Sequence, residues 1–229
     1  MTVQENLQTI NEQIHAACQR VGRDPKEVKV IAVTKYVSEE TTREALDAGI
    51  EHIGENRVEG GLDKWEALGS RGTWHFIGSL QSKKVKKVIG KFTYFHSLDR
   101  ISLAKEIQKR AEEDDIVRCF VQVNVSGEES KAGLEPDEVI EFIESLAQFP
   151  AIKVVGLMTM APFVEDIEET RPVFRGLCAL QKKVQALHLS HAPCDELSMG
   201  MSNDYTVAIE EGATFIRLGS SLVGNEMNE

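Results

Sequence analysis

The chain has 229 residues, of which 41% are hydrophobic and 28% are charged, as is usual for a globular protein of one large or two small domains. Its net charge of −11 and the lack of a long basic tract argue against a nucleic-acid partner. No apolar run approaches the roughly 18 residues that cross a bilayer, and no leader segment is evident, so we expect a cytoplasmic protein with no membrane partner.

Helix-like and strand-like segments alternate along the chain. Apolar residues at three- and four-residue spacing predict an amphipathic helix over residues 2–21, and Gly22 is suited to end it. Apolar runs predict strands over residues 28–35, 50–55, 73–78, 92–98, 117–125, 152–160, 196–199 and 214–218. Helix-like patterns between them cover residues 39–48, 57–68, 82–89, 99–113, 136–149, 166–188 and 204–210.

This β-then-α alternation predicts parallel strands joined by right-handed crossovers. Eight such units in about 200 residues fit a single (β/α)8 TIM barrel with an extra N-terminal helix. A doubly wound open sheet is the alternative α/β fold, because counting strands from one sequence is reliable only to one or two. No linker or low-complexity tract divides the chain, so we predict one domain over residues 1–229.

Lys35 closes the first predicted strand. Barrels bind ligands at the C-terminal ends of their strands, and an amine partly shielded from water there is nucleophilic towards carbonyl groups. The alternative is a lysine that opens a solvated loop, where most lysines lie. Polar residues also close other predicted strands, among them Asn56 and His75. The histidine is either a ligand contact or a satisfied core residue.

Two loops late in the chain are rich in small residues. Gly219-Ser220-Ser221 follows the eighth predicted strand, and residues 198–204 follow or overlap the end of the seventh. Barrels commonly bind phosphate at these two positions, where backbone N–H groups and hydroxyls are free to donate. Arg217, within the eighth strand, is either an inward-facing buried cation or an outward-facing residue whose stem covers a helix.

Two kinds of protein are compatible with a strand-end lysine together with two anion-binding loops and an internal arginine. One binds pyridoxal phosphate, and the other is a class I aldolase, which uses lysine without a cofactor. The four cysteines lie far apart with no C-x-x-C spacing, and no cluster of histidine, cysteine and carboxylate has the spacing of a metal site. We therefore predict neither a disulfide framework nor a metal.

Seven short motifs follow one another in a fixed order along the chain. They are Ala32-Val33-Thr34-Lys35, Gly54-Glu55-Asn56-Arg57-Val58, Trp74-His75-Phe76-Ile77-Gly78-Ser79-Leu80-Gln81, Val123-Asn124-Val125-Ser126-Gly127-Glu128-Glu129-Ser130-Lys131-Ala132-Gly133, Gly156-Leu157-Met158-Thr159-Met160, Leu197-Ser198-Met199-Gly200-Met201-Ser202-Asn203-Asp204 and Ile216-Arg217-Leu218-Gly219-Ser220. Over residues 5–226 the chain resembles the pyridoxal phosphate homeostasis protein family through this ordered set.

The resemblance implies a barrel of pyridoxal phosphate fold type III, similar to the N-terminal domain of alanine racemase. It implies a covalent aldimine between the cofactor and Lys35, and an arginine, here Arg217, near the pyridine nitrogen. An arginine there disfavours a protonated ring and so weakens its capacity as an electron sink. The phosphate-binding positions of the family match Ser202, Gly219 and Ser220, and positions that line the pocket match Asn56, His75 and Met199.

The chain departs from the family pattern at the edges of these motifs. Tyr36-Val37 stands where the family has Thr or Phe and then Pro, Lys83 replaces an asparagine, and Val223 replaces a phenylalanine. The lysine and the two small-residue loops are intact. These departures leave the cofactor prediction unchanged but put the rim of the site in doubt.

The resemblance implies a protein that binds pyridoxal 5′-phosphate for cofactor homeostasis without turnover of its own. The expected partners are pyridoxal phosphate and, as recipients, apo forms of pyridoxal phosphate-dependent enzymes, with the protein itself a monomer or weak dimer. The alternative is a small amino-acid racemase or lyase that uses the same lysine. Racemisation requires a second acid–base group on the opposite cofactor face, and none of Tyr36, Tyr94 and Tyr205 is an evident candidate.

Overall fold

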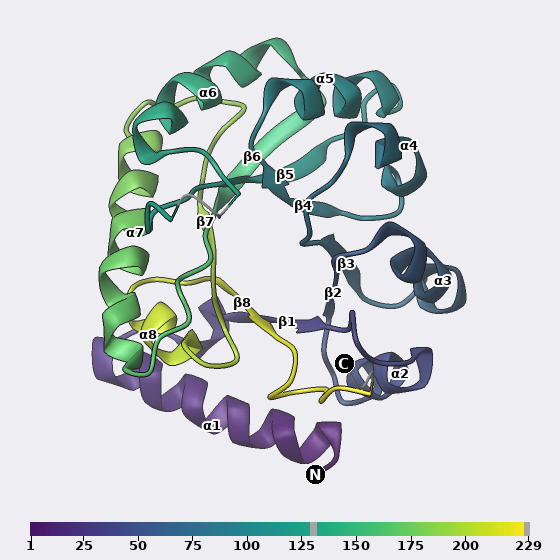
Figure 1. Ribbon diagram of the computed structural model, residues 1–229, viewed down its shortest axis with the longest axis vertical. Helices are drawn as coiled ribbons and strands as arrows, with labels where there is room; N and C mark the ends of the chain where they lie inside the picture. Colours follow the sequence, from purple (N-terminus) through teal and green to yellow (C-terminus); the bar gives the residue numbers. More distant parts are fainter. Residues whose placement is uncertain (129–131, 227–229) are drawn as a thin grey trace.

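The computed structural model describes residues 1–128 and 132–226, and its centre is a closed barrel (Figure 1). Within these residues eight parallel strands pair in chain order, and the last pairs with the first. The strands are β1 (Lys29–Val33), β2 (His52–Glu55), β3 (Thr73–Phe76), β4 (Tyr94–Leu98), β5 (Val117–Gln122), β6 (Ile152–Met158), β7 (Glu196–Met201) and β8 (Phe215–Leu218). The predicted TIM barrel is confirmed, and the pairing of β1 with β8 excludes the open sheet.

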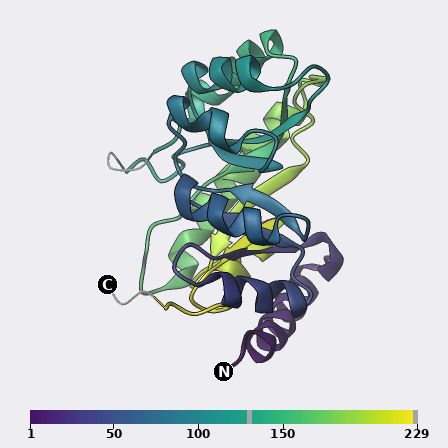
Figure 2. The ribbon, with the colours of Figure 1, turned by 90° about the vertical axis from the view of Figure 1, so that its right-hand side faces the viewer.

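Helices surround the barrel on the outside (Figure 1 and Figure 2). They are α1 (Val3–Val21), α2 (Glu39–Asp47), α3 (Val58–Leu68), α4 (Val85–Val88), α5 (Ile101–Arg110), α6 (Val139–Ser145), α7 (Arg171–Gln185) and α8 (Tyr205–Glu210). No helix within residues 1–128 and 132–226 is long and apolar enough to cross a membrane.

Helix α1 is the predicted extra helix that precedes the first strand. Its start is fixed by a capping box, in which Thr2 and Glu5 satisfy each other's backbone N–H groups. Its end is fixed by Gly22, whose φ of 70° lies in the left-handed region that glycine adopts without strain. The helix buries one apolar stripe and runs beside α8 at the lower edge of the ring (Figure 1).

Several predicted helices are shorter in the structure than their sequence patterns indicate; the segment 136–149, for example, forms α6 between two 3-10 turns. The segment 82–89 forms a 3-10 turn and the single helical turn α4, in which Val85 and Val88 are buried while the lysines face solvent. The segment 166–188 opens with the 3-10 turn Ile167–Thr170, and α7 begins only at Arg171. Pro172 explains this start, since proline is tolerated in the first turn of a helix and disfavours helical conformation before it.

The barrel interior is partly apolar and partly polar. At its centre Ile31, Phe120, Met158 and Phe215 form a small cluster distinct from the larger core between strands and helices. Polar side chains continue the interior towards the C-terminal strand ends. Those buried there are His75, His96, Ser198 and Arg217. Because burial of polar groups is costly unless they are hydrogen-bonded, this composition indicates a binding site between the apolar cluster and the C-terminal strand ends.

Candidate functional site

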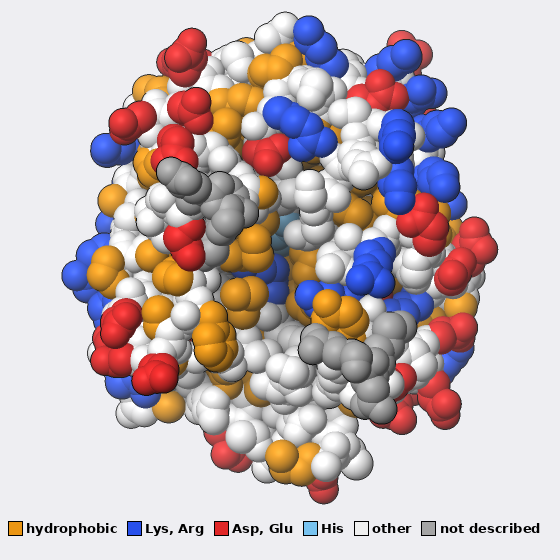
Figure 3. Space-filling view, viewed as in Figure 1, with side chains coloured by type: hydrophobic (Ala, Val, Ile, Leu, Met, Phe, Trp, Pro, Cys, Tyr) orange, Lys and Arg blue, Asp and Glu red, His pale blue; other side chains and the backbone are white. Residues whose placement is uncertain are grey.

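A cavity of about 510 Å³ opens at the C-terminal ends of the strands. It forms the hollow at the centre of the face seen in Figure 3. Its lining comes from loops that follow seven of the strands, namely β1, β2, β3, β5, β6, β7 and β8, together with residues of the strands themselves. Barrel enzymes and binding proteins place their sites at this end, so the cavity is the candidate functional site.

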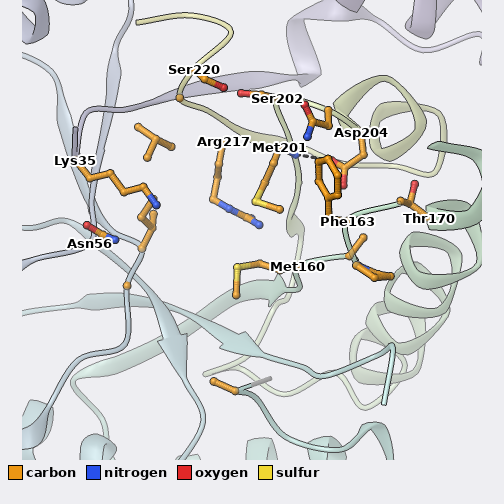
Figure 4. A pocket seen from close by; sticks show the side chains of 18 of the residues that line it. Lys35, Asn56, Met160, Phe163, Thr170, Met201, Ser202, Asp204, Arg217 and Ser220 are labelled. Carbon is orange, nitrogen blue, oxygen red and sulfur yellow. Dashed lines mark hydrogen bonds between the residues drawn. The ribbon is translucent and has the colours of Figure 1, made fainter. Parts of the chain in front are cut away.

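Lys35 lies two residues beyond β1 and points its amine into the cavity (Figure 4). The nearest buried carboxylate on the neighbouring strand is already paired elsewhere. Glu55, 2% exposed at the end of β2, accepts hydrogen bonds from Thr34 Oγ1 at 2.5 Å and from Lys64 Nζ at 2.8 Å. The Lys35 amine instead lies 4.6 Å from the centre of the Tyr36 ring. This arrangement leaves the amine directed towards a ligand.

Arg217 faces inward from β8, which resolves the two alternatives that its local sequence left open. The side chain is 5% exposed and lines the cavity. Its guanidinium donates from Nη1 to Ser198 Oγ at 2.5 Å and from Nη2 to the carbonyl oxygen of Thr159 at 2.9 Å. Burial lowers the pKa of Arg217 to about 10, although nearby Asp204 opposes this shift. A guanidinium has five N–H groups, so further donors remain for a ligand.

Serine hydroxyls gather on the opposite rim, where the loops after β7 and β8 meet. Ser202 and Ser220 line the cavity together with Gly219 (Figure 4). Ser221 donates from its hydroxyl to Ser202 Oγ at 2.9 Å and from its backbone N–H to the same atom at 3.4 Å. The two loops therefore form one surface of hydroxyl and amide groups, which is the donor set that binds phosphate.

Gly200 permits the bend that brings the β7 loop to this surface. Its φ is +94°, and a Cβ there would lie 2.7 Å from the Cβ of Ala208 in α8. Asp204 then fixes the loop, because its Oδ1 accepts the Met201 N–H at 2.6 Å. Burial raises the pKa of the Asp204 carboxyl, opposed by that backbone hydrogen bond and by Arg217. Small residues in this loop are thus required by packing as well as by ligand access.

Asn56 contributes a buried acceptor with no partner. Its Oδ1 is shielded from solvent and, within the part of the chain that the structure describes, accepts no hydrogen bond. The residue lines the cavity beside Lys35 (Figure 4). An unpaired buried acceptor is costly and indicates a ligand that donates to it.

Two of the residues expected at the pocket lie elsewhere. His75 is fully buried inside the barrel, where it stacks on Tyr94 and hydrogen-bonds to other histidines. Met199 is fully buried in the larger core between strands and helices. Neither lines the cavity, whereas the other six do: Lys35, Asn56, Ser202, Arg217, Gly219 and Ser220. Glu129, Ser130 and Lys131 of the fourth sequence motif lie outside the described residues.

The loop after β6 supplies a wall that the sequence reasoning missed. Phe163 and Ile167 line the cavity after Met160, together with Thr170. Phe163 is 86% exposed, which is unusual for phenylalanine in a folded protein. The signal available in the sequence was an apolar run, Ala161-Pro162-Phe163-Val164, directly after a strand end.

The donor and acceptor set fits pyridoxal 5′-phosphate. The cavity offers an amine for an aldehyde, a hydroxyl and amide surface for a phosphate, donor groups of Arg217 for a ring nitrogen, and an orphaned acceptor at Asn56 for a hydroxyl. These groups come from β1, β2, β7 and β8 and meet only in the closed barrel.

Fold and site together define a barrel of the alanine racemase N-terminal type. The model of the family described as "Alanine racemase, N-terminal domain" matches residues 6–226. The barrel also superposes on an alanine racemase from Clostridium difficile 630 with a TM-score of 0.75 at 14% identity, covering 96% of this chain and 56% of that one. At that identity the likeness is one of fold.

Comparison with curated relatives is more specific. The chain is 46% identical over 226 residues to the pyridoxal phosphate homeostasis protein of Aquifex aeolicus (strain VF5), covering 98% of both chains. It is 35% identical over 231 residues to the protein of that name from Escherichia coli (strain K12), covering 97% of this chain and 96% of the relative. The solved structure of PipY from Synechococcus elongatus PCC7942 with PLP bound has a TM-score of 0.84 at 32% identity, covering 97% of this chain and 100% of that one. The chain belongs to the pyridoxal phosphate homeostasis protein family.

Proposed function

We propose that this protein binds pyridoxal 5′-phosphate in the cavity at the strand ends and takes part in the homeostasis of that cofactor. The observation that carries the proposal is the convergence of Lys35, Arg217 and the serine surface on one cavity. The family's name and the PLP-bound PipY structure, which is similar over nearly the whole chain, support it.

In this proposal each group of the site has a separate task. The Lys35 amine holds the cofactor covalently, while Ser202, Gly219 and Ser220 hold its phosphate. Asn56 orients the ring edge through its unpaired Oδ1, and Arg217 donates to the ring nitrogen. When bound, the cofactor supplies a reactive aldehyde carbon and a ring that can accept electrons.

The proposal predicts a holder of the cofactor without turnover. Arginine can only donate hydrogen bonds, so the ring nitrogen beside Arg217 receives a hydrogen bond but no proton. An unprotonated ring is a weak electron sink, which disfavours loss of an amino-acid proton. Of the three tyrosines, Tyr94 packs against His75 in the interior and Tyr205 donates to Gln13 on α1, whereas Tyr36 lies beside Lys35.

Cofactor binding itself is tested by titration. Pyridoxal 5′-phosphate added to the purified protein is expected to give an absorption band distinct from that of the free aldehyde. Reduction with borohydride should then fix one cofactor per chain, detected as a mass increase. A protein that takes up no cofactor and stays colourless would refute the proposal.

Ser202→Ala is expected to weaken cofactor binding by about tenfold, because one hydrogen bond to a charged phosphate is lost. The dissociation constant from the absorption titration measures the effect. Ser190→Ala is the matched control, since Ser190 is exposed and precedes the N-terminal end of β7, whereas the cavity lies at the C-terminal strand ends. Equal affinities of the two variants would contradict the role given to Ser202.

The alternative function, a small racemase or lyase, is tested by turnover. Loaded protein incubated with a panel of L-amino acids is expected to yield no D-enantiomer, keto acid or ammonia above a cofactor-only control. Sustained turnover that disappears in Tyr36→Phe would replace the holder by an enzyme with Tyr36 as its second acid–base group.

We further propose that apo forms of pyridoxal phosphate-dependent enzymes receive the cofactor. We propose that the protein is a monomer or weak dimer. We also propose that residues 1–229 form one domain. The closed barrel, with helix α1 packed on its side, supports the single domain. We expect the cofactor to enter through the end of the barrel at which the cavity opens.

A further inference from the structure

A column of five hydrogen-bonded side chains crosses the barrel interior. His52 begins β2 at one end of the barrel, and Arg217 lines the cavity at the other. Between them, His75 Nε2 lies 2.9 Å from His52 Nδ1, and His96 Nε2 lies 2.9 Å from His75 Nδ1. Ser198 Oγ lies 2.9 Å from His96 Nδ1 and accepts from Arg217 at 2.5 Å.

The rings of this column are held in fixed orientations. His75 stacks on Tyr94 with centroids 4.5 Å apart and planes 3° apart. His96 stacks on Phe120 with centroids 4.3 Å apart and planes 23° apart. Burial lowers the pKa of both histidines well below the usual range; Lys29 lowers the pKa of His75 further, and Arg217 that of His96. Both rings are therefore neutral, with one N–H and one acceptor nitrogen each.

Arg217 determines which side chain donates and which accepts in each hydrogen bond of the column. Arg217 can only donate, so Ser198 Oγ accepts from it, and the single Ser198 proton is free to be donated to His96 Nδ1. His96 then carries its proton on Nε2 and donates to His75, and His75 donates to His52 in the same sense. In the reverse direction Ser198 would accept twice, and its own proton would find no acceptor among the described residues, inside a fully buried site.

We propose that Ser198 and His96 are positioning residues for Arg217, and that the column keeps His52, His75 and His96 as neutral Nε2–H tautomers. Arg217 is anchored on one side by the Thr159 carbonyl oxygen and on the other by Ser198. The Ser198 hydroxyl accepts more strongly from Arg217 while it donates its proton to His96, because linked hydrogen bonds polarise one another. The column thus fixes the guanidinium before any ligand enters. Only the expected effect on cofactor binding rests on the proposed function; the direction of the hydrogen bonds in the column does not.

The first test uses the ligand-free protein. The chain has six histidines, and ¹⁵N labelling of their rings reports the tautomer of each. Single His→Gln variants assign the signals. Three neutral Nε2–H tautomers at His52, His75 and His96 near neutral pH are expected. A neutral Nδ1–H tautomer at His96, or an imidazolium at His75 or His96, would overturn the proposed direction.

The second test removes the link between the column and the arginine. Ser198→Ala is expected to change the ring ¹⁵N shifts of His96 and His75 and to weaken pyridoxal 5′-phosphate binding about tenfold, since Arg217 loses an anchor. Ser198→Thr, which keeps the hydroxyl, should restore both readouts. His191→Gln is the control, because that ring bonds to the Ile143 carbonyl oxygen outside the barrel interior.

The outcomes separate this inference from the proposed function. Unchanged His96 shifts together with unchanged cofactor affinity in Ser198→Ala would overturn the positioning role. Wild-type protein that shows the three tautomers but takes up no pyridoxal 5′-phosphate would refute the proposed function and leave the column intact. Should Ser198→Ala not fold, His96→Leu serves as the second variant: it removes the acceptor of the Ser198 proton, and a cofactor affinity equal to that of the wild type would overturn the positioning role.

Discussion

Replacing Lys35 by alanine is expected to abolish covalent retention of pyridoxal 5′-phosphate. The Lys35 amine lies in the cavity, and the buried pair of Glu55 and Lys64 beside it is complete without it. Without the covalent link only the phosphate and ring contacts remain, so the affinity should fall by roughly two orders of magnitude. Loss of the absorption band, and of the mass increase after borohydride reduction, measures the effect.

Lys35→Arg separates the charge from the chemistry of this residue. It keeps a cation at the strand end but removes the nucleophilic amine, so it should lose the covalent adduct as Lys35→Ala does. Lys84→Ala is the matched control, because Lys84 lies on the outer surface and pairs with exposed Glu59. A reducible adduct that persists at full yield in Lys35→Ala would place the covalent link on another amine.

Most of the fold follows from local patterns in the sequence. The predicted strand 28–35 is β1 (Lys29–Val33), and the predicted strand 214–218 is β8 (Phe215–Leu218). Most strand lengths are overestimated, because the residues that follow a strand, such as Thr34 after β1, are also buried although the ladder has ended. The seventh strand is underestimated: the sequence predicts residues 196–199, and β7 is Glu196–Met201. Closure of the barrel was not encoded in any one segment, since it depends on β1 meeting β8.

The site was less accessible to sequence reasoning, for physical reasons. Both faces of a barrel strand are buried, so alternation along β8 does not reveal which way Arg217 points. His75 resembles a strand-end ligand in sequence, but the stagger between strands puts it beside His52 and His96 in the interior. The wall formed by Phe163 and Ile167 after Met160 was missed because apolar loop residues carry no chemical signature of their own.

The ion pair of Lys64 with Glu55 shows how core stability and site geometry are coupled. Lys64 lies on α3 and Glu55 at the end of β2, with side chains 12% and 2% exposed. Besides pairing with Glu55 at 2.8 Å, the Lys64 ammonium donates to the carbonyl oxygen of Thr34, which directly precedes Lys35. Lys64 therefore fixes the start of the loop after β1 as well as pairing with the buried Glu55 side chain.

Lys64→Met is expected to destabilise the protein by about 3 kcal/mol, because it leaves the Glu55 carboxylate buried without its counterion. Adding Glu55→Leu to it should recover most of the loss, since an apolar pair of similar volume needs no desolvation. Urea unfolding of the two single variants and the double variant gives the coupling energy. The control is Lys84→Met, whose exposed pair with Glu59 should contribute little to stability because solvent screens it. A Lys64→Met variant as stable as that control would contradict the stabilising role given to the pair of Lys64 and Glu55.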